Sequence, residues 1–207
     1  DGDYLDSELS AVIDKDKIRA GLYKSYEKYA KGKKGIIYAI DRKHANHICE
    51  LYATKGVSVC MIDGTTPTVE REQKIADFAN GSIEVIVNVN IFSEGFDCPD
   101  IEFIQLARPT KSLSLYLQQV GRGLRISEGK ETTVILDNVG LYNRFGTPMA
   151  NRHWRYHFLG TDNEEGYNDG SGIKRDLILD SDSEYEPDYS EADEEMVVVE
   201  HAEGNAQ

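Results

Sequence analysis

The sequence contains only three cysteines, Cys49, Cys60 and Cys98, among its 207 residues. So few scattered thiols exclude a disulfide framework and a cysteine-ligated zinc site, since both need more ligands at regular spacing. No apolar run approaches the about 18 residues of a membrane-spanning helix, and no N-terminal segment has the basic-then-apolar pattern of a signal peptide. We therefore expect a soluble chain in the reducing cytoplasm. Its first residue is Asp1 rather than Met, so we expect a piece of a longer protein.

Basic residues are also scarce: 23 Lys and Arg stand against 37 Asp and Glu, a formal net charge of −14. Spread evenly, this charge would oppose binding to nucleic-acid phosphates. However, residues 161–207 hold 16 acidic and two basic residues, whereas residues 1–160 hold 21 of each sign. The sequence predicts a neutral globular part that can present a local basic surface, followed by an acidic tail. The tail is either a solvated extension or a mimic of nucleic acid.

Short apolar runs alternate with helical patterns through the middle of the chain. Strands are predicted at 35–40, 57–62, 84–89, 101–106 and 132–137. Between them we expect helices, one with Thr66 as its N-cap and Pro67 in its first turn, and another capped by Ser112. A further helix is predicted over 15–30. Strands that alternate with helices imply right-handed crossovers and a mainly parallel sheet covered on both faces, with functional loops at the carboxyl ends of the strands.

The segment Gln118-Gln-Val-Gly121-Arg122-Gly-Leu-Arg125 carries the clearest chemical pattern. Arginines three residues apart near the end of a helix can point the same way and fork hydrogen bonds onto phosphate oxygens. They suit an arginine-finger role on a γ-phosphoryl group. From the spacing alone, they could also be surface arginines near the negative end of a helix dipole.

A second pattern is Ser93-Glu-Gly-Phe-Asp97, in the loop after the third predicted strand. Gly95 lets the backbone approach a ligand, and the Asp97 carboxylate can accept hydrogen bonds from ribose hydroxyls. Taken alone, the same residues could form an ordinary turn before Pro99.

Taken in order, these segments match a family. Gly95 and Asp97 are followed by Arg108-Pro-Thr-Lys-Ser112 and then by Gln-x-x-Gly-Arg-x-x-Arg. This order resembles motifs V and VI of superfamily-two helicases, in the C-terminal RecA-like lobe of the DEAD/DEAH-box group and especially its DNA-repair and restriction-motor relatives. The resemblance covers residues 33–148. It implies a RecA-like three-layer α/β fold.

The resemblance also extends to the segments on either side. Residues 36–42 resemble motif IV, Gly64 with Arg71 and Phe78 fits the following family pattern, and residues 136–140 resemble the segment that closes the lobe. The domain boundaries we expect are a flanking helical segment at 1–32, the lobe at 33–148, a basic and aromatic extension at 149–160, and the acidic tail at 161–207.

The resemblance implies a role for each matching residue. Arg122 and Arg125 would be catalytic, reaching the γ-phosphate of ATP across an interlobe cleft. The residues implied to bind the nucleotide are Gln118, Gly121, Gly95 and Asp97. Those implied to contact the nucleic-acid backbone, with DNA favoured, are Asp41, Arg42, Gly64, Arg71 and Asn90. Such backbone contacts suit a motor that must ignore base sequence.

The sequence departs from the family pattern in two kinds of place. Val89 stands where many members have Thr, and Thr68 stands where many have Gln. More important, the sequence contains neither a Gly-x-x-x-x-Gly-Lys-Ser/Thr phosphate loop nor an Asp-Glu-x-Asp/His magnesium motif. ATP with Mg²⁺ would therefore be bound with an N-terminal RecA-like lobe, and this chain alone should be inactive.

The sequence is thus expected to be the second motor lobe of an ATP-dependent helicase or translocase. Two alternatives are a non-catalytic nucleic-acid or protein-binding module derived from such a lobe, and the translocase subunit of a restriction complex. Among weaker signals, His44 and His47 are interpreted as a solvated helix face rather than metal ligands, because no third ligand lies nearby. Residues 152–159 could stack on nucleic acid or pack on the lobe.

Overall fold

The computed structural model describes residues 3–90, 98–150 and 198–200. The elements in chain order are α1 (Asp6–Ile13), α2 (Asp16–Tyr29), β1 (Gly35–Tyr38), α3 (Arg42–Thr54), β2 (Val59–Asp63), α4 (Thr68–Ala79), β3 (Val85–Val89), β4 (Phe103–Leu106), α5 (Leu113–Gly123), β5 (Thr132–Asp137), α6 (Leu141–Phe145) and β6 (Val198–Glu200). No helix in these ranges is both long and apolar enough to cross a membrane.

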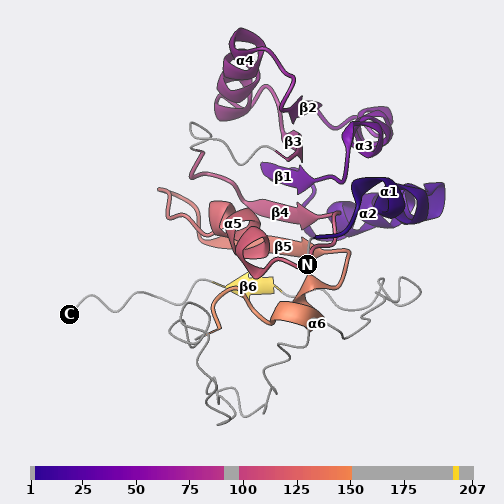
Figure 1. Ribbon diagram of the computed structural model, residues 1–207. Helices are drawn as coiled ribbons and strands as arrows, with labels where there is room; N and C mark the ends of the chain where they lie inside the picture. The colour runs from indigo at the N-terminus through magenta and orange to yellow at the C-terminus, as the bar shows by residue number, and fades with distance from the viewer. Residues whose placement is uncertain (1–2, 91–97, 151–197, 201–207) are drawn as a thin grey trace.

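One sheet forms the centre of the fold, with strand order β2-β3-β1-β4-β5-β6. The first five strands run parallel, and β6 adds to the edge as an antiparallel partner of β5. In Figure 1 the sheet runs from β2 at the top to β6 at the bottom. This arrangement confirms the predicted α/β fold with a mainly parallel sheet.

Helices cover both faces of the sheet, as the apolar strands require (Figure 1). On one face, α2 and α3 pack on the sheet and contribute Tyr26 and Tyr52 to a cluster that includes Ile37 of β1. On the other face, α4 and α5 pack around a second cluster that includes Ile36. The neighbouring residues Ile36 and Ile37 therefore point to opposite, equally buried faces, which is why β1 is apolar throughout.

The predicted strands all exist, and the structure adds three elements that the sequence did not predict: α1, α6 and β6. Helix α1 is short and buries Leu9 and Ile13 against Ile40, just beyond the carboxyl end of β1. The side of the sheet toward which β1 and β4 point therefore also carries the N-terminal segment (Figure 1).

One predicted helix cap is correct and the other is wrong. The Ser112 hydroxyl accepts a hydrogen bond from the Leu115 N–H at 3.2 Å, as an N-cap should. By contrast, α4 has Pro67 as its N-cap, and Thr66 lies outside the helix. The Thr66 hydroxyl instead donates to Asp63 at 3.0 Å, so the local turn that begins at Asp63 competes successfully with the helix for this side chain.

Candidate functional site

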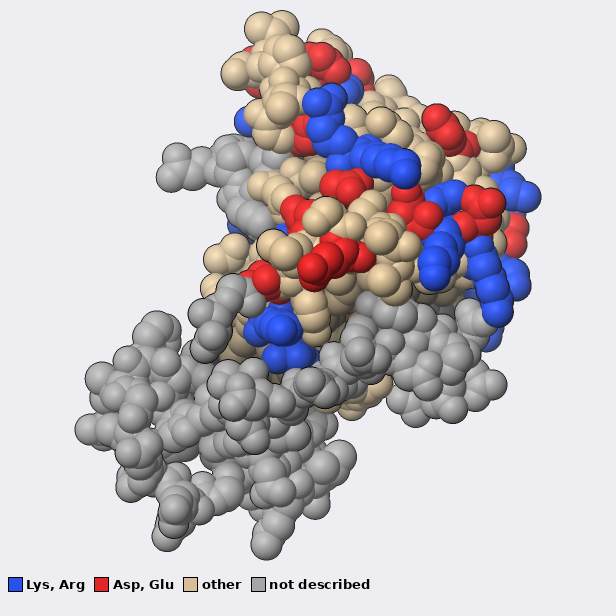
Figure 2. Space-filling model, turned by 45° about the vertical axis from the view of Figure 1, so that its right-hand side comes forward, with Lys and Arg blue, Asp and Glu red and all other residues tan. Residues whose placement is uncertain are grey.

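The predicted site residues lie at two opposite ends of the sheet. Asp41 and Arg42 follow β1, Gly64 follows β2 and Asn90 follows β3. We call this side, together with Arg108 after β4, the carboxyl edge. Figure 2 turns this side of the molecule forward and shows acidic side chains among the basic ones.

The end of α5 lies at the other end of the sheet, because a crossover helix between parallel strands returns antiparallel to them. A Cβ on Gly123 would lie 2.7 Å from the side chain of Ile104 and 2.8 Å from that of Thr133, the second residues of β4 and β5. Arg122 and Arg125 therefore belong to the amino ends of these strands. Only one of the two groups of predicted site residues therefore lies at the carboxyl ends of the strands.

The first part of the carboxyl edge is the start of α3. Asp41 is its N-cap, and the carboxylate accepts from the His44 N–H at 2.7 Å. Arg42 points outward, with 61% of its side chain exposed, and its Nε lies 2.6 Å from Oδ2 of Asp63. A Cβ on Gly64 would meet nothing within 4 Å. Asp41 thus shapes the backbone here, while Arg42 and Gly64 are open to a ligand.

Asp63, at the end of β2, organises this part of the edge and was not identified from the sequence. Its buried carboxylate accepts hydrogen bonds from the backbone and hydroxyl of Thr65, both at 2.9 Å, and from Thr66. Burial opposes ionisation, but these hydrogen bonds and the charge of Arg42 hold the pKa of Asp63 below its ordinary value. An acidic residue followed by Gly-Thr-Thr was the available signal, since Asx turns follow this pattern.

Arg71 supports the same turn from within. Its Nη2 donates to the Thr66 carbonyl at 3.1 Å, and its buried Nε has no hydrogen-bond partner within the described part of the chain. The structure therefore places Arg71 behind the turn that carries Gly64.

Asn90 and Arg108 form the second part of the carboxyl edge. Asn90 has a positive φ of 51°, a conformation that Asn tolerates better than most residues. Its Oδ1 accepts from Arg108 Nη1 at 2.6 Å. Arg108 is only 8% exposed and lies two residues after the end of β4. Arg108 belongs to a family motif in the sequence, but no site role was predicted for it.

The end of α5 is fastened to the sheet by two side chains. The Thr133 hydroxyl donates to the Gly123 carbonyl at 2.6 Å. The Lys130 ammonium donates to the carbonyls of Gly123, Arg125 and Pro99, at 2.5, 2.8 and 3.1 Å. Burial lowers the pKa of Lys130, opposed by the charges of Asp100 and Glu102. Lys130, which the sequence did not identify, thus ties the arginine segment to the loop that follows Asp97.

The side chains along α5 present a consistent outer face. Gln118 and Arg125 lie outside the core, whereas Gln119 and Val120 are buried. Gln118 and Arg122 are four residues apart, so their side chains share this face with the open position Gly121. Gly95 and Asp97 lie outside the described residues, as do residues 152–159 and most of the acidic tail.

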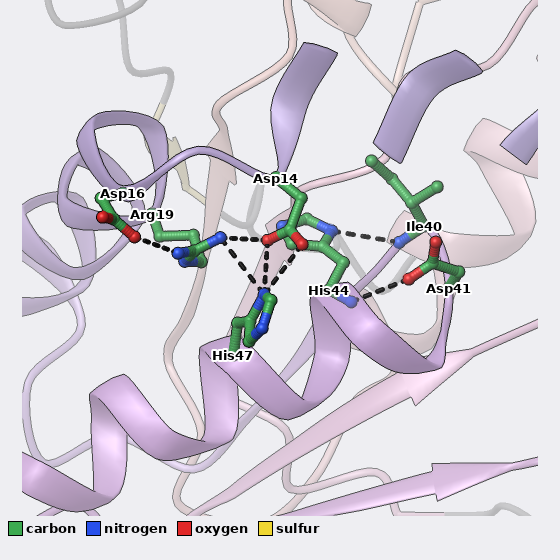
Figure 3. A network of polar contacts seen from close by, with 7 residues as sticks. All are labelled: Asp14, Asp16, Arg19, Ile40, Asp41, His44 and His47. Atoms are coloured by element: carbon green, nitrogen blue, oxygen red, sulfur yellow. Dashed lines mark hydrogen bonds and ion pairs between the residues drawn. The ribbon is translucent and has the colours of Figure 1, made fainter. Parts of the chain in front are cut away.

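The interpretation of His44 and His47 as a solvated helix face is wrong. His44 is fully buried, its Nδ1 accepts from the Ile40 N–H, and desolvation lowers its pKa to about 4. His47 Nδ1 lies 2.8 Å from Asp14, which also pairs with Arg19 (Figure 3). This network fastens the turn between α1 and α2 to the first turns of α3. No group of metal-binding side chains occurs among the described residues.

The parallel sheet with helices on both faces, and the arginine-bearing helix α5 after β4, are typical of a RecA-like α/β lobe. Residues 16–127 match the family model of the helicase conserved C-terminal domain, and the chain belongs to this family. The resemblance to superfamily-two helicases is thereby confirmed.

Individual relatives agree. The chain is 36% identical over 159 residues to the 51.5 kDa protein of a Lactococcus phage, covering 77% of this chain and 35% of that protein. It is 36% identical over 133 residues to IRC3 of Saccharomyces cerevisiae, a candidate ATP-dependent helicase by its name, covering 64% of this chain and 18% of the relative. The chain therefore spans about a third or less of the length of these relatives.

Among solved structures, the fold is similar to the Escherichia coli DEAD-box protein SrmB bound to regulator of ribonuclease activity A. The TM-score is 0.52 at 19% identity, with 62% of this chain and 77% of that chain covered. This likeness supports the RecA-like fold alone.

Proposed function

We propose that this chain is the second motor lobe of an ATP-dependent helicase or translocase that acts on nucleic acid. The observation that carries the proposal is the anchoring of α5. Lys130 and Thr133 fix its last carbonyls, while Gln118, Arg122 and Arg125 stay on its outer side. A rigid support with charged groups at its end is what stabilising a transferring phosphoryl group requires.

In this proposal Arg122 and Arg125 act as arginine fingers. Their guanidinium groups stabilise the charge that develops on the γ-phosphate of ATP, bound mainly by the N-terminal lobe. Gln118 and Gly121 lie beside the nucleotide, and Gly95 and Asp97 contact its ribose. ATP would be bound with Mg²⁺ whose ligands belong to the other lobe. Since this sequence has no phosphate loop, the chain alone would hydrolyse no ATP.

The carboxyl edge would contact the nucleic-acid strand, with DNA favoured by the resemblance to repair and restriction motors. Arg42 is an exposed cation there, and the backbone at Gly64 is open. Asn90 supplies a polar group at the position next to Val89, where many family members have Thr. Asp41 and Arg71 would act by shaping the backbone that meets the phosphates. The nucleotide and the nucleic-acid strand would thus be contacted at opposite ends of the sheet. This arrangement suits a lobe that links ATP turnover to movement along the nucleic acid.

We also propose the cytoplasm as the location. The cysteines are free thiols, and burial raises the pKa of Cys49 to about 12 and that of Cys60 to about 11. Such thiols stay protonated and inert, as suits a reducing compartment.

The test is Arg125→Ala in the longer protein that includes both lobes. Strand-stimulated ATP turnover should fall by about a thousandfold or more, because a finger acts on the transition state. The affinity for nucleic acid should stay within about twofold of the wild-type value, since Arg125 lies at the end of the sheet opposite the carboxyl edge. Lys17→Ala, an exposed cation on α2, is the control. Wild-type turnover in Arg125→Ala would refute the arginine-finger role of Arg125, whereas a wild-type longer protein without ATP turnover would favour a non-catalytic binding module.

A further inference from the structure

The N-terminal segment places two carboxylates on the carboxyl edge. Asp3 accepts hydrogen bonds from the Thr110 hydroxyl and from the Lys111 backbone N–H, both at 2.8 Å. Its Oδ2 also lies 3.8 Å from Arg108 Nη2. One carboxylate is thus held by a hydroxyl, a backbone N–H and a guanidinium, a donor set that suits an oxyanion.

Arg108 is the centre of this arrangement. Its side chain is 10% exposed, and its Nη2 donates to Asp6 at 3.0 Å. Asn90 Nδ2 also donates to Asp6, at 3.4 Å. The buried Nε of Arg108 has no hydrogen-bond partner among the described residues. A buried guanidinium needs an anionic partner, and both partners here come from a segment more than 100 positions away in the sequence.

From these contacts we infer that Arg108, Thr110 and the backbone N–H of Lys111 form a binding site for one phosphate of the nucleic-acid strand, and that Asp3 occupies this site in competition with it. The inference rests on the proposed function, since it adds a contact to the proposed strand-binding edge. A phosphodiester offers two oxygens to the donors that now hold one carboxylate. The neighbours Asn90 and Arg42 lie on the same edge.

The segment is built so that Asp3 can leave while the fold persists. Asp3 is exposed and precedes α1, whose N-cap Leu5 makes no side-chain capping hydrogen bond. Helix α1 keeps its own anchors when Asp3 leaves, namely Leu9 and Ile13 in the core and the pair of Asp6 with Arg108. Lys111 Nζ lies 4.7 Å from the centre of the Tyr4 ring, so displacement of Asp3 and Tyr4 would also release a cation toward the phosphate. The strand would thus gain a cation as it displaces a carboxylate.

The experiment measures binding of the whole chain to a fluorescein-labelled oligo-dT by fluorescence anisotropy over a range of NaCl concentrations. Asp3→Asn should bind about three- to tenfold tighter at low salt. Its plot of log affinity against log salt should be steeper by about 0.7, the value for one more phosphate contact on a single strand. Glu8→Gln is the matched control, because Glu8 is an exposed acid on α1. It should change affinity by less than about twofold, with an unchanged slope.

A second pair of variants tests the donors. Arg108→Gln should weaken binding, and its plot of log affinity against log salt should be shallower by about 0.7. When Asp3→Asn is added to Arg108→Gln, it should have no further effect on binding. Because Arg108 is buried, Thr110→Val, which removes only the hydroxyl, provides a variant less prone to unfold. In that background Asp3→Asn should tighten binding by less than half as much. Thermal melting confirms that each variant is folded.

Equal effects of Asp3→Asn and Glu8→Gln would overturn the inference, as they would reflect net charge alone. Persistence of the full Asp3→Asn effect in both Arg108→Gln and Thr110→Val would also overturn it. Arg42→Gln separates this result from the proposed function. If Arg42→Gln weakens binding while the Asp3 and Arg108 variants do not, the strand-binding edge stands without this phosphate site. If neither the wild type nor any variant binds, the nucleic-acid part of the proposed function fails together with it.

Discussion

Lys130→Met is the most direct test of how the arginine end of α5 is held. Methionine keeps a long unbranched side chain but cannot donate to the three carbonyls that Lys130 contacts, those of Gly123, Arg125 and Pro99. Thr133 would still hold the Gly123 carbonyl. The carbonyls of Arg125 and Pro99 would lose their link, so the segment after α5 would be free to move relative to the loop that follows Asp97.

The expected loss of stability is modest. A hydrogen bond from a charged donor contributes about 1.5–3 kcal/mol, but Lys130 is partly exposed and water replaces some of what it gives. We therefore expect a net loss of about 1–2 kcal/mol. For a chain of this size that corresponds to a melting temperature lower by about 2–8 °C. If Arg125 acts as the arginine finger proposed above, the turnover number of the two-lobed protein should fall about tenfold, because a small displacement of a catalytic group is costly.

Circular dichroism melts of the 207-residue chain and steady-state ATPase assays of the longer protein give the two measurements. Lys31→Met is the matched control, since Lys31 has 67% of its side chain exposed and its ion pair is with Glu27 at 3.9 Å. In an Arg125→Ala background, Lys130→Met should not reduce turnover further, because both act through one group. A Lys130→Met protein with wild-type melting and wild-type turnover would refute the reasoning.

Three other predictions concern the stability of the lobe. Asp63→Asn should lower the free energy of unfolding, measured in urea at pH 7, by about 1–2 kcal/mol. Because the folded pKa of Asp63 lies below 3.8, this advantage of the wild type is present above that pH and should vanish as the pH falls through the folded pKa. An unchanged difference at low pH would argue against an ionised Asp63. Gly123→Ala should destabilise by about 1–3 kcal/mol, since its Cβ would lie 2.7 Å from a β4 side chain, whereas Gly121→Ala, in open space on the same helix, should be neutral or stabilising; similar melting temperatures for the two would contradict the close packing. His44 has a folded pKa of about 4 against 6.5 when unfolded, so the unfolded state binds the proton first and stability should fall by about 2 kcal/mol from pH 7 to pH 5. His44→Asn should lose this part of the pH dependence. If the free energy of unfolding of the variant falls between pH 7 and pH 5 as much as that of the wild type, His44 does not cause the dependence.

Much of the fold could be predicted from the sequence because its strands and most of its helices are specified locally. The apolar runs around Ile36, Ile86 and Ile104 allow only strands buried on both faces. The Ser112 cap and the Gly-Arg-x-x-Arg spacing likewise depend on residues a few positions apart. Helix α1 and strand β6 escaped prediction because each is short and is stabilised only by what it packs against.

The local rules failed where one side chain had two possible partners. Thr66 could cap α4, yet its hydroxyl bonds to Asp63. His44 and His47 have the spacing of an exposed helix face, yet the α1–α2 turn covers them and supplies Asp14. For Thr66 the competing partner is only three residues away, in the Asx turn that begins at Asp63, so the sequence contained the signal. For His44 and His47 the choice depended on the distant α1–α2 turn, which no pattern around these residues could have revealed.

By itself, the sequence determined the α/β class, the order of the strands along the chain and the helicase family, because each depends on periodicity or on motif spacing. Only the tertiary structure decided that the site residues divide between two ends of the sheet. It alone showed that Lys130 fastens the arginine segment and that Asp3 and Asp6 meet Arg108. The physical reason is that an ion pair or hydrogen bond depends on distance in space. The crossover connections bring together side chains that lie more than a hundred residues apart in the sequence.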